Sequence, residues 1–255
     1  MGRQKSQQTF GKPSLPEMND RRAATLFIVG MPIGIPDDLT LRARTVLGQV
    51  SIVAAESPRT TRALLDHHGI AATITGYGGG DTEKIAILLD RLNAGHDIAL
   101  VSDSGMPVIY DPGRLLIAAA RAEGHRVTVI PGPSAVTAAA ALSGCRADRL
   151  LFIGRLPQSR RRLDQLIQTL VGEAGTTVMF APPSTLPRIL DRIGRILPRR
   201  TVTLAVNMTK TDEQLYQGKA SHLLKRAASL PKDSEVTLLL SGARKGKRTP
   251  IAAGS

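Results

Sequence analysis

The sequence has few of the residues on which several specialised protein classes depend. It contains one cysteine, Cys145, so an intrachain disulfide and a zinc site built from several cysteines are excluded. No histidine is near Cys145 in the sequence, and we therefore expect a small buried side chain rather than a nucleophile. Tryptophan is absent and aromatic residues make up 3% of the chain, so stacking of single-stranded bases is not a conspicuous feature.

Long apolar segments are also missing. No run of 18 apolar residues occurs in the 255 residues, so we expect no membrane-spanning helix and no membrane partner. Residues 1–24 are polar and basic and lack the apolar segment of a signal peptide. Together with the lone cysteine, these features predict a cytoplasmic location.

The common nucleotide-binding fingerprints are absent. No G-x-G-x-x-G pattern follows the first predicted strand, and no G-x-x-x-x-G-K-[ST] segment is present. His67 and His68 are adjacent rather than one helical turn apart, so we expect them to face different ways and to form no metal site. We therefore expect no dinucleotide or ATP site built on these motifs and no metal site built on these histidines.

Positive charge is what the sequence has in excess. Lysine and arginine total 34 against 21 acidic residues, for a net charge of +13. Both ends, 1–24 and 243–255, are basic, and we predict that they are tails outside the folded domains. A basic body with basic tails suits a polyanionic partner such as nucleic acid. A generally basic proteome with solvated tails predicts the same composition.

Strands and helices alternate through the first half of the chain. Predicted strands lie at 26–29, 51–55, 97–102 and 126–130, and predicted helices at 39–50, 60–68, 82–94, 112–123 and 134–143. Strands separated by helices of this length indicate βαβ units and a parallel sheet. We expect Asp37 or Asp38 to cap the second element, Pro112 to lie in the first turn of its helix, and Ser134 to cap the alanine-rich helix.

The second half has a different character. Predicted strands lie at 150–154, 176–180, 201–206 and 235–240, and predicted helices at 160–171, 184–196 and 221–228. The stop at Pro131-Gly132-Pro133 separates the halves. We therefore predict an N-terminal α/β domain over 25–131 with a mostly parallel sheet and a smaller, mixed α/β domain over 132–242.

Three strand ends carry the most unusual segments of the chain. Met31–Gly34, Asp103–Val108 and Pro131–Ser134 each follow a predicted strand. Ligands of open α/β sheets bind beyond the carboxyl ends of the strands, and glycine lets the backbone approach a ligand closely. One such turn is ordinary, but three at one edge predict a small-molecule site.

Five segments, in order along the chain, resemble one known family. They are LFIVGMPIGIPDDLTLRA at 26–43, ALVSDSGMPVIYDPG at 99–113, VIPGPSA at 129–135, DRLLFIGRLP at 148–157 and MTKTDEQLYQG at 208–218. These segments resemble ribosomal RNA small subunit methyltransferase I, a branch of the tetrapyrrole methylase family. The resemblance implies a two-domain class III methyltransferase, typically a homodimer, with S-adenosyl-L-methionine between its domains.

The resemblance also assigns cofactor-binding positions. On the first domain they are Pro32, Asp103, Ser104, Gly105, Met106, Pro107, Val108, Ser134 and Ala135, and on the second domain Phe180, Ala181, Val206 and Asn207. Polar family motifs depart here: the histidines of H-E-H-N-E are replaced at 77–81, and glutamates are lost at 180–184 and at Asn207. The cofactor side is retained better than the side expected to face substrate.

Candidate residues for catalysis and RNA contact follow from the same resemblance. Glu56, Asp103 and Lys210 are the candidates at the expected cleft. Glu56 could accept the proton of a ribose hydroxyl, and Lys210 could stabilise alkoxide character or hold a phosphate. The structural alternative is that Glu56 pairs with a neighbouring arginine and that Lys210 is a solvated lysine. Predicted phosphate contacts are Arg59, Arg155, Arg160, Arg161 and Arg162.

The resemblance implies ribose 2′-O-methylation of a cytidine in 16S ribosomal RNA, with the RNA or the small ribosomal subunit as partner. Two alternatives stay open. A methyltransferase of the same fold could act on a small molecule such as an acidic tetrapyrrole precursor, or on a peptide. A homologue that has lost polar substrate residues could bind RNA with weak catalysis or none.

Overall fold

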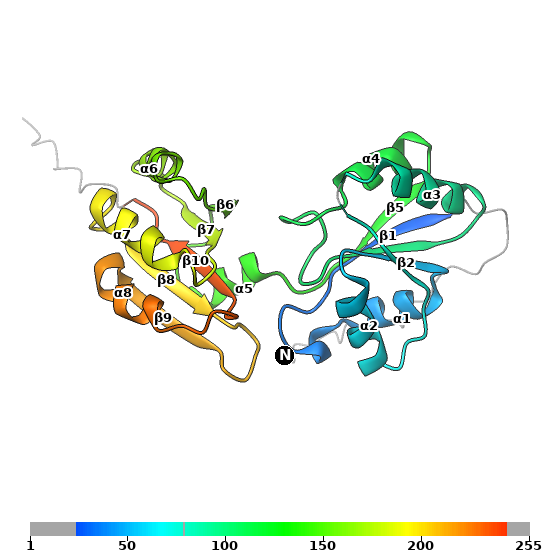
Figure 1. Cartoon of the computed structure of the whole chain (residues 1–255), viewed down its shortest axis with the longest axis horizontal. Coiled ribbons are helices and arrows are strands. Elements are labelled where there is room, and N and C mark those ends of the chain that lie inside the picture. The colour runs from blue at the N-terminus through cyan, green and yellow to red at the C-terminus, as the bar shows by residue number, and fades with distance from the viewer. Residues whose placement is uncertain (1–23, 79, 244–255) are drawn as a thin grey trace, which may run out of the picture.

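A computed structural model describes residues 24–78 and 80–243 of the chain. The described residues form two lobes joined at a narrow junction (Figure 1), each built on its own five-stranded sheet. The predicted tails, 1–24 and 243–255, lie outside the described residues apart from Ala24 and Ala243.

The N-terminal lobe contains a fully parallel sheet. Its strands are β1 (Thr25–Val29), β2 (Ile52–Ala55), β3 (Ile74–Gly76), β4 (Ile98–Val101) and β5 (Arg126–Ile130). They lie in the order β3-β2-β4-β1-β5, and every neighbouring pair is parallel. Because all the strands run in one direction, their carboxyl ends meet at a single edge of the sheet.

Helices cover both faces of this sheet (Figure 1). They are α1 (Leu41–Gln49), α2 (Pro58–His67), α3 (Thr82–Asn93) and α4 (Arg114–Ala122). Leu47 and Leu65 bring α1 and α2 into one apolar cluster, while Leu92 and Leu116 bring α3 and α4 into another. Coverage of both faces explains why the central strand β4 is buried along its whole length.

The C-terminal lobe contains a mixed sheet. Its strands are β6 (Leu150–Arg155), β7 (Thr176–Phe180), β8 (Thr201–Val206), β9 (Gln214–Lys219) and β10 (Val236–Leu240). They lie in the order β6-β7-β10-β8-β9, with β6 and β7 parallel and the other pairs antiparallel. The predicted α/β class with a parallel first sheet and a mixed second sheet is therefore confirmed.

The helices of this lobe divide between the two sheet faces. They are α5 (Ala135–Ser143), α6 (Arg160–Thr169), α7 (Leu186–Ile196) and α8 (Ala220–Ala228). Ala139 and Ala140 pack α5 against β7, β8 and β10, and the other three helices share the larger apolar cluster. The chain thus passes from the first sheet to the second between Ile130 and Ala135.

Two strands were not predicted, because neither has the expected pattern. β3 is only three residues long. β9 has the polar sequence QLYQGK and is largely exposed, since it forms the edge of the sheet and pairs only with β8. An edge strand needs no apolar face of the kind that sequence patterns detect.

The predicted helix starts were partly wrong. Thr40, rather than Asp37 or Asp38, caps α1 by accepting a hydrogen bond from the Ala43 amide at 3.2 Å, because residues 36–38 form a separate 3₁₀ turn. Helix α4 begins only after Gly113, whose φ of 136° no other residue adopts readily, so Pro112 precedes the helix.

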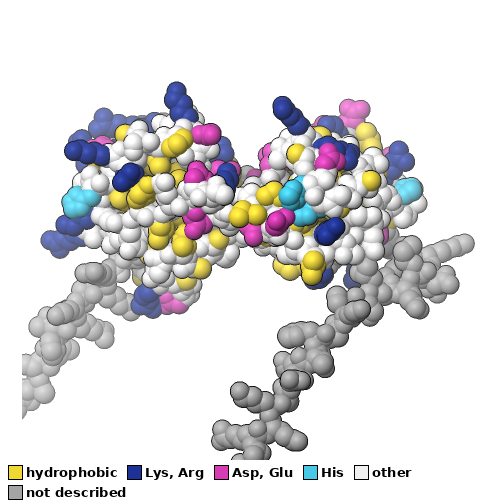
Figure 2. Space-filling model, turned by 90° about the horizontal axis from the view of Figure 1, so that it is seen from below, with side chains coloured by type: hydrophobic (Ala, Val, Ile, Leu, Met, Phe, Trp, Pro, Cys, Tyr) yellow, Lys and Arg dark blue, Asp and Glu magenta, His cyan; other side chains and the backbone are white. Residues whose placement is uncertain are grey.

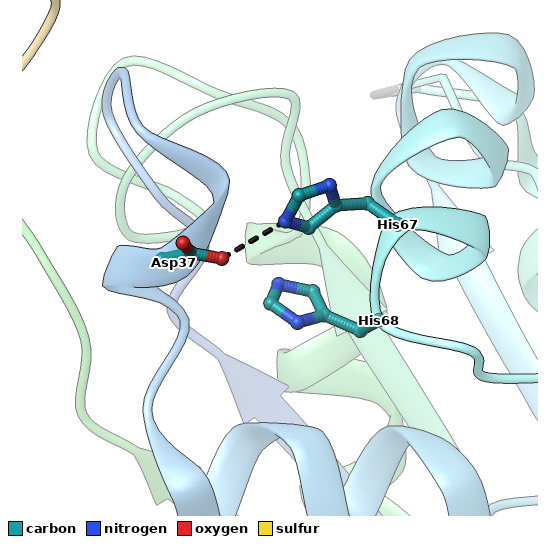
Figure 3. Close-up of side chains that lie close together, drawn as sticks. All are labelled: Asp37, His67 and His68. Atoms are coloured by element: carbon teal, nitrogen blue, oxygen red, sulfur yellow. Dashed lines mark hydrogen bonds and ion pairs between the residues drawn. The ribbon is translucent and has the colours of Figure 1, made fainter.

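Four side chains also differ from the prediction. Ser134 occupies the cap position of α5, but within the described structure its hydroxyl makes no capping hydrogen bond. Cys145 is half-buried rather than buried. His67 and His68 point toward the same aspartate, Asp37, and not away from each other (Figure 3).

No helix within 24–78 and 80–243 has the length and apolarity to cross a membrane.

Two backbone segments cross in contact where β1 and β5 end. A Cβ on Gly132 would lie 2.8 Å from the carbonyl carbon of Gly30, and a Cβ on Gly30 would lie 2.7 Å from Gly132 Cα. Only glycine permits this approach at both positions. The crossing brings the segments after β1 and β5 together at the edge of the sheet.

The Gly132→Ala substitution is expected to lower the free energy of unfolding by about 1–3 kcal/mol, because the new methyl group overlaps backbone that cannot move aside. Equilibrium urea denaturation would measure the change. Gly48→Ala in α1 is the matched control: its Cβ would meet no described atom within 4 Å, and alanine favours helix, so stability should stay equal or rise. Equal effects of the two substitutions would contradict this account.

Candidate functional site

A cavity of about 330 Å³ lies between the two lobes, at the carboxyl edge of the parallel sheet. The N-terminal lobe and α5 contribute Ile33, Ser104, Gly105, Met106, Ile109, Tyr110, Asp111, Ser134, Ala135 and Val136. The C-terminal lobe contributes Arg155, Phe180, Ala181, Pro182, Met208, Ser234, Glu235, Val236 and Thr237. Its volume is in the range of small-molecule sites.

The surface around this junction is chemically uneven. Figure 2 shows acidic side chains on both sides of the junction, while most lysine and arginine side chains lie farther out on the two lobes. The cavity wall contains two acidic residues, Asp111 and Glu235, and one basic residue, Arg155. The cavity is therefore not a basic pocket.

The segments that follow β1 and β4 are bonded to each other. The Met31 amide donates to the Gly105 carbonyl at 2.8 Å, and the Ser102 hydroxyl donates to the same carbonyl at 3.4 Å. Gly105 has a φ of 71°, a conformation that favours glycine. These bonds fix the backbone at the cavity wall.

An unusual backbone brings Tyr110 across to the other lobe. Val108 and Tyr110 have φ values of 75° and 72°, which are rare for such side chains and indicate local strain. The Tyr110 ring lies edge-to-face with Phe180, with centroids 6.2 Å apart, and the guanidinium of Arg155 lies 5.3 Å from its centroid. A Cβ on Gly154 would lie 2.8 Å from the same ring. Tyr110 thus joins the lobes at the cavity.

Asp111 is the titratable group of the cavity whose pKa is most perturbed. Burial, together with the negative charges of Glu56 and Asp103, raises the pKa of Asp111 to about 6, although Ser102 and Arg155 oppose the rise. Such a carboxyl group changes charge close to neutral pH and can accept a proton there. No local sequence signal distinguishes Asp111, although the residue lies in the family-like segment at 99–113.

The predicted cofactor positions fall into two groups. Those in the cavity wall are Ser104, Gly105, Met106, Ser134, Ala135, Phe180 and Ala181. Those outside the lining are Pro32, Asp103, Pro107, Val108, Val206 and Asn207.

Of the positions outside the lining, Asn207 has a clear local role. Its amide donates to the Glu235 carbonyl at 2.9 Å and its side-chain oxygen accepts from the Glu235 amide at 2.8 Å, which fixes the backbone of Glu235, a residue of the cavity wall just before β10.

Glu56 and Lys210, for which catalytic roles were predicted, lie outside the lining of the cavity. Glu56 is exposed, and its Oε2 accepts a hydrogen bond from the Asp103 amide at 3.4 Å. Among the described residues it forms no ion pair with an arginine, so the expected structural alternative does not occur. Lys210 is not a free surface lysine either, since its Nζ lies 3.0 Å from Glu235 Oε1.

The predicted phosphate contacts are not on one surface. Arg155 lies in the cavity wall. Arg160, Arg161 and Arg162 form the exposed first turn of α6, where Ser159 caps the helix. Arg59 is exposed in the first turn of α2, on the other lobe (Figure 1). A ligand that contacts all five must extend over both lobes.

Comparisons with known proteins agree with this architecture. The family of Tetrapyrrole (Corrin/Porphyrin) Methylases matches residues 25–224. The ribosomal RNA small subunit methyltransferase I of Thermotoga maritima is 37% identical over 218 residues, which cover 85% of this chain and 98% of that protein.

Solved structures show the same fold at low identity. A cobalt precorrin-4 methyltransferase of cobalamin biosynthesis has a TM-score of 0.67 at 18% identity, covering 85% of this chain and 94% of that chain. The uroporphyrin-III C-methyltransferase of Thermus thermophilus in complex with S-adenosylhomocysteine has a TM-score of 0.56 at 18% identity, covering 86% and 97%.

The Asp111→Asn substitution is expected to stabilise the protein, and more so at higher pH. A folded pKa of about 6 lies above the ordinary aspartate pKa of 3.8, so the folded state binds protons more tightly. The free energy of unfolding of the wild-type protein therefore falls as the pH rises from 3.8 to about 6. At pH 7.5 the gain should be about 1–2 kcal/mol, allowing for partial exposure to solvent, and at pH 4.5 it should be smaller. Urea denaturation at both values measures the difference, with the exposed Asp90→Asn as control. A gain that does not change with pH would contradict the burial of Asp111.

Proposed function

Because the chain belongs to the tetrapyrrole methylase family and, within it, to the ribosomal RNA small subunit methyltransferase I group, it is an S-adenosylmethionine-dependent methyltransferase, and we propose that it methylates a ribose 2′-hydroxyl of a cytidine in 16S ribosomal RNA. The identity to the Thermotoga maritima protein over nearly its whole length carries this proposal. We further propose a cytoplasmic homodimer that acts on the small subunit or its RNA.

We assign the cofactor to the cavity between the lobes. The wall combines apolar side chains, among them Ile33, Met106 and Phe180, with backbone groups at strand ends. Ser234 Oγ is buried in this wall and has no hydrogen-bond partner among the described residues. An unpaired buried hydroxyl is unfavourable, so a ligand with polar groups in the cavity fits the residues present. When bound, S-adenosylmethionine supplies an activated methyl group.

The proposed contacts follow the two groups of predicted positions. Direct contacts are assigned to Ser104, Gly105, Met106, Ser134, Ala135, Phe180 and Ala181, with Ser234 added. The remaining positions, Pro32, Asp103, Pro107, Val108, Val206 and Asn207, are assigned to support of the contacting loops. The uroporphyrin-III C-methyltransferase of Thermus thermophilus, which has the same fold, was solved in complex with S-adenosylhomocysteine, and this supports a cofactor site in the fold.

Asp111 is our candidate for the group that accepts the proton of the methyl acceptor. It lies in the cavity wall, and its raised pKa of about 6 leaves it ionised at neutral pH yet basic enough to take a proton. Glu56 contributes through its charge, which raises the pKa of Asp111. This modifies the role first expected for Glu56, which lies outside the lining.

Cations around the cavity are assigned to the RNA backbone. Arg155 lies in the wall beside Tyr110 and can hold a phosphate next to the acceptor ribose. Lys210 is paired with Glu235, so a phosphate contact would require it to exchange one anionic partner for another. Arg59 and Arg160–Arg162 extend the proposed contact over both lobes.

The substrate is tested by offering radiolabelled S-adenosylmethionine with small ribosomal subunits, naked 16S RNA and a small-molecule extract in parallel. Label at a cytidine 2′-oxygen supports the proposal. Label confined to the small-molecule pool would replace RNA with a small-molecule acceptor. Salt-dependent RNA binding without transfer would leave an RNA-binding homologue.

The pH dependence of single-turnover methyl transfer tests Asp111. A base must be deprotonated, so the rate should rise with pH and level off above about 6, the pKa of Asp111. Asp111→Asn should lower the rate by about 10²–10⁴-fold and remove this inflection. The exposed Asp90→Asn variant should keep the wild-type profile. A variant of Asp111 that retains the inflection would exclude it as the base.

The arginines of α6 are tested by salt dependence. Replacing Arg160, Arg161 and Arg162 with glutamine should weaken RNA binding for all sequences. It should also reduce the slope of log affinity against log salt by about 0.7–0.9 for each phosphate that the variant no longer binds. Arg121→Gln on α4 removes one charge from an exposed site on the other lobe and serves as the control. An unchanged slope in the triple variant would show that α6 does not contact RNA.

A further inference from the structure

A cluster of three side chains lies on the outside of the N-terminal lobe. Asp37, His67 and His68 point toward one another (Figure 3), with His67 Nε2 2.9 Å from Asp37 Oδ1. The imidazole rings lie edge-to-face with centroids 4.9 Å apart. One potential ligand atom from each residue lies within 4.8 Å of the others. The cluster therefore has the composition of a metal site, and its ligand atoms lie close enough to converge on one ion after side-chain adjustment.

The end of α2 explains how two adjacent histidines converge. The helix ends at His67, and His68 follows as its C-cap with φ of −92° and ψ of 3°, before Gly69 turns the chain with a φ of 64°. Arg44 of α1 donates to the His68 carbonyl at 3.3 Å, and His68 Nε2 donates to the Pro36 carbonyl at 2.9 Å. Because a carbonyl can only accept, this Nε2 carries the proton, so His68 would bind an ion through Nδ1 or after releasing this hydrogen bond. His68 is thus held in place from two elements.

Asp37 is presented by the 3₁₀ turn at 36–38. The Leu39 amide closes this turn by bonding the Pro36 carbonyl at 3.1 Å. The side chains of His67 and Asp37 are 49% and 78% exposed, so water has access to the cluster. The site requires no rearrangement of the core to admit an ion.

The donor set selects the class of ion. Two imidazoles and one carboxylate suit zinc and its neighbours among the divalent transition metals, whereas calcium and magnesium prefer oxygen ligands alone. Ligands bonded to a tetrahedral ion at about 2.0–2.1 Å lie about 3.4 Å apart. The 2.9 Å separation of His67 Nε2 and Asp37 Oδ1 needs only a small side-chain adjustment to reach this value.

We propose that Asp37, His67 and His68 bind one divalent metal ion of the zinc class, with water completing its coordination. The ion would replace the proton that His67 and Asp37 now share, and it would link the end of α2 to the turn at 36–38. This is a site separate from the cavity, and the inference does not rest on the proposed methyl acceptor.

The position of the site gives the ion a structural consequence. The turn at 36–38 continues the loop in which Ile33 lines the cavity. In the same loop, the Ile35 amide donates to Thr209 Oγ1 of the C-terminal lobe at 3.1 Å. An ion at the outer end of this loop would therefore hold the wall of the cavity and its contact with the second lobe.

Binding is tested on the full, untagged chain after removal of metals with a chelator. Zn²⁺ is titrated by calorimetry, and Co²⁺ by its visible absorption, which reports the number and kind of ligands. We expect one ion per chain and a rise in the unfolding temperature with metal concentration. His67→Ala and Asp37→Asn should each weaken binding by more than about 100-fold, since they remove ligands rather than supporting groups.

The controls separate this site from other metal-binding side chains. His96→Ala and His222→Ala remove exposed histidines elsewhere, Cys145→Ser removes the thiol, and all three should keep wild-type affinity. Circular dichroism checks that each variant is folded, and Asp37→Asn provides a second test if a histidine variant is not. Absence of binding would reduce the cluster to a hydrogen-bonded contact. Equal binding by wild type and a His67→Ala/His68→Ala double variant would also overturn the proposal.

Discussion

The architecture of the site depends on close backbone contact at the edge of the parallel sheet. Gly30 and Gly132 cross with no room for a Cβ on either residue, and the Met31 amide bonds the Gly105 carbonyl alongside them. These contacts join the segments after β1, β4 and β5 into one wall. Because the same contacts set where the chain leaves the first sheet, they also set where α5 and the second lobe begin. The cavity is a consequence of this geometry.

Basic and acidic residues have different roles in the proposed function. On the face drawn in Figure 2, acidic side chains lie on both sides of the junction and most basic side chains lie farther out. Burial and two neighbouring carboxylates keep Asp111 easily protonated. In the proposed function, the outer charge attracts RNA over a long distance and the cavity supplies a base that works near neutral pH. Arg155, a cation in the cavity wall, lowers the pKa of Asp111 but does not cancel the effects of burial and the two carboxylates, so this pKa stays at about 6.

The loop from Met31 to Asp38 connects three parts of the molecule. Its start bonds the segment after β4, Ile33 lines the cavity, and its end forms the 3₁₀ turn that carries Asp37. Near Gly34 it also meets Met208 and Thr209 of the second lobe, where an added Cβ would lie 2.6 Å from the Met208 carbonyl oxygen. An event at the outer end of this loop can therefore reach the cavity through a few covalently connected residues.

The sequence by itself determined the fold class, the order of most elements and the family, because apolar runs, strand-end glycines and ordered motifs are local features of the chain. It also located the segments that form the cavity, including Ser104–Met106 and Ser134. The domain limits at 131 and 132 and the roles of the site residues stay predictions.

Only the tertiary structure decided which groups meet. The pKa of Asp111 depends on burial, on Glu56, which is distant in sequence, and on Arg155 of the second lobe. The edge strand β9 exists because β8 offers it a partner. His67 and His68 converge because a helix ends between them and a turn thirty residues earlier presents Asp37. Each of these depends on contacts between segments far apart in the chain, which no local pattern encodes.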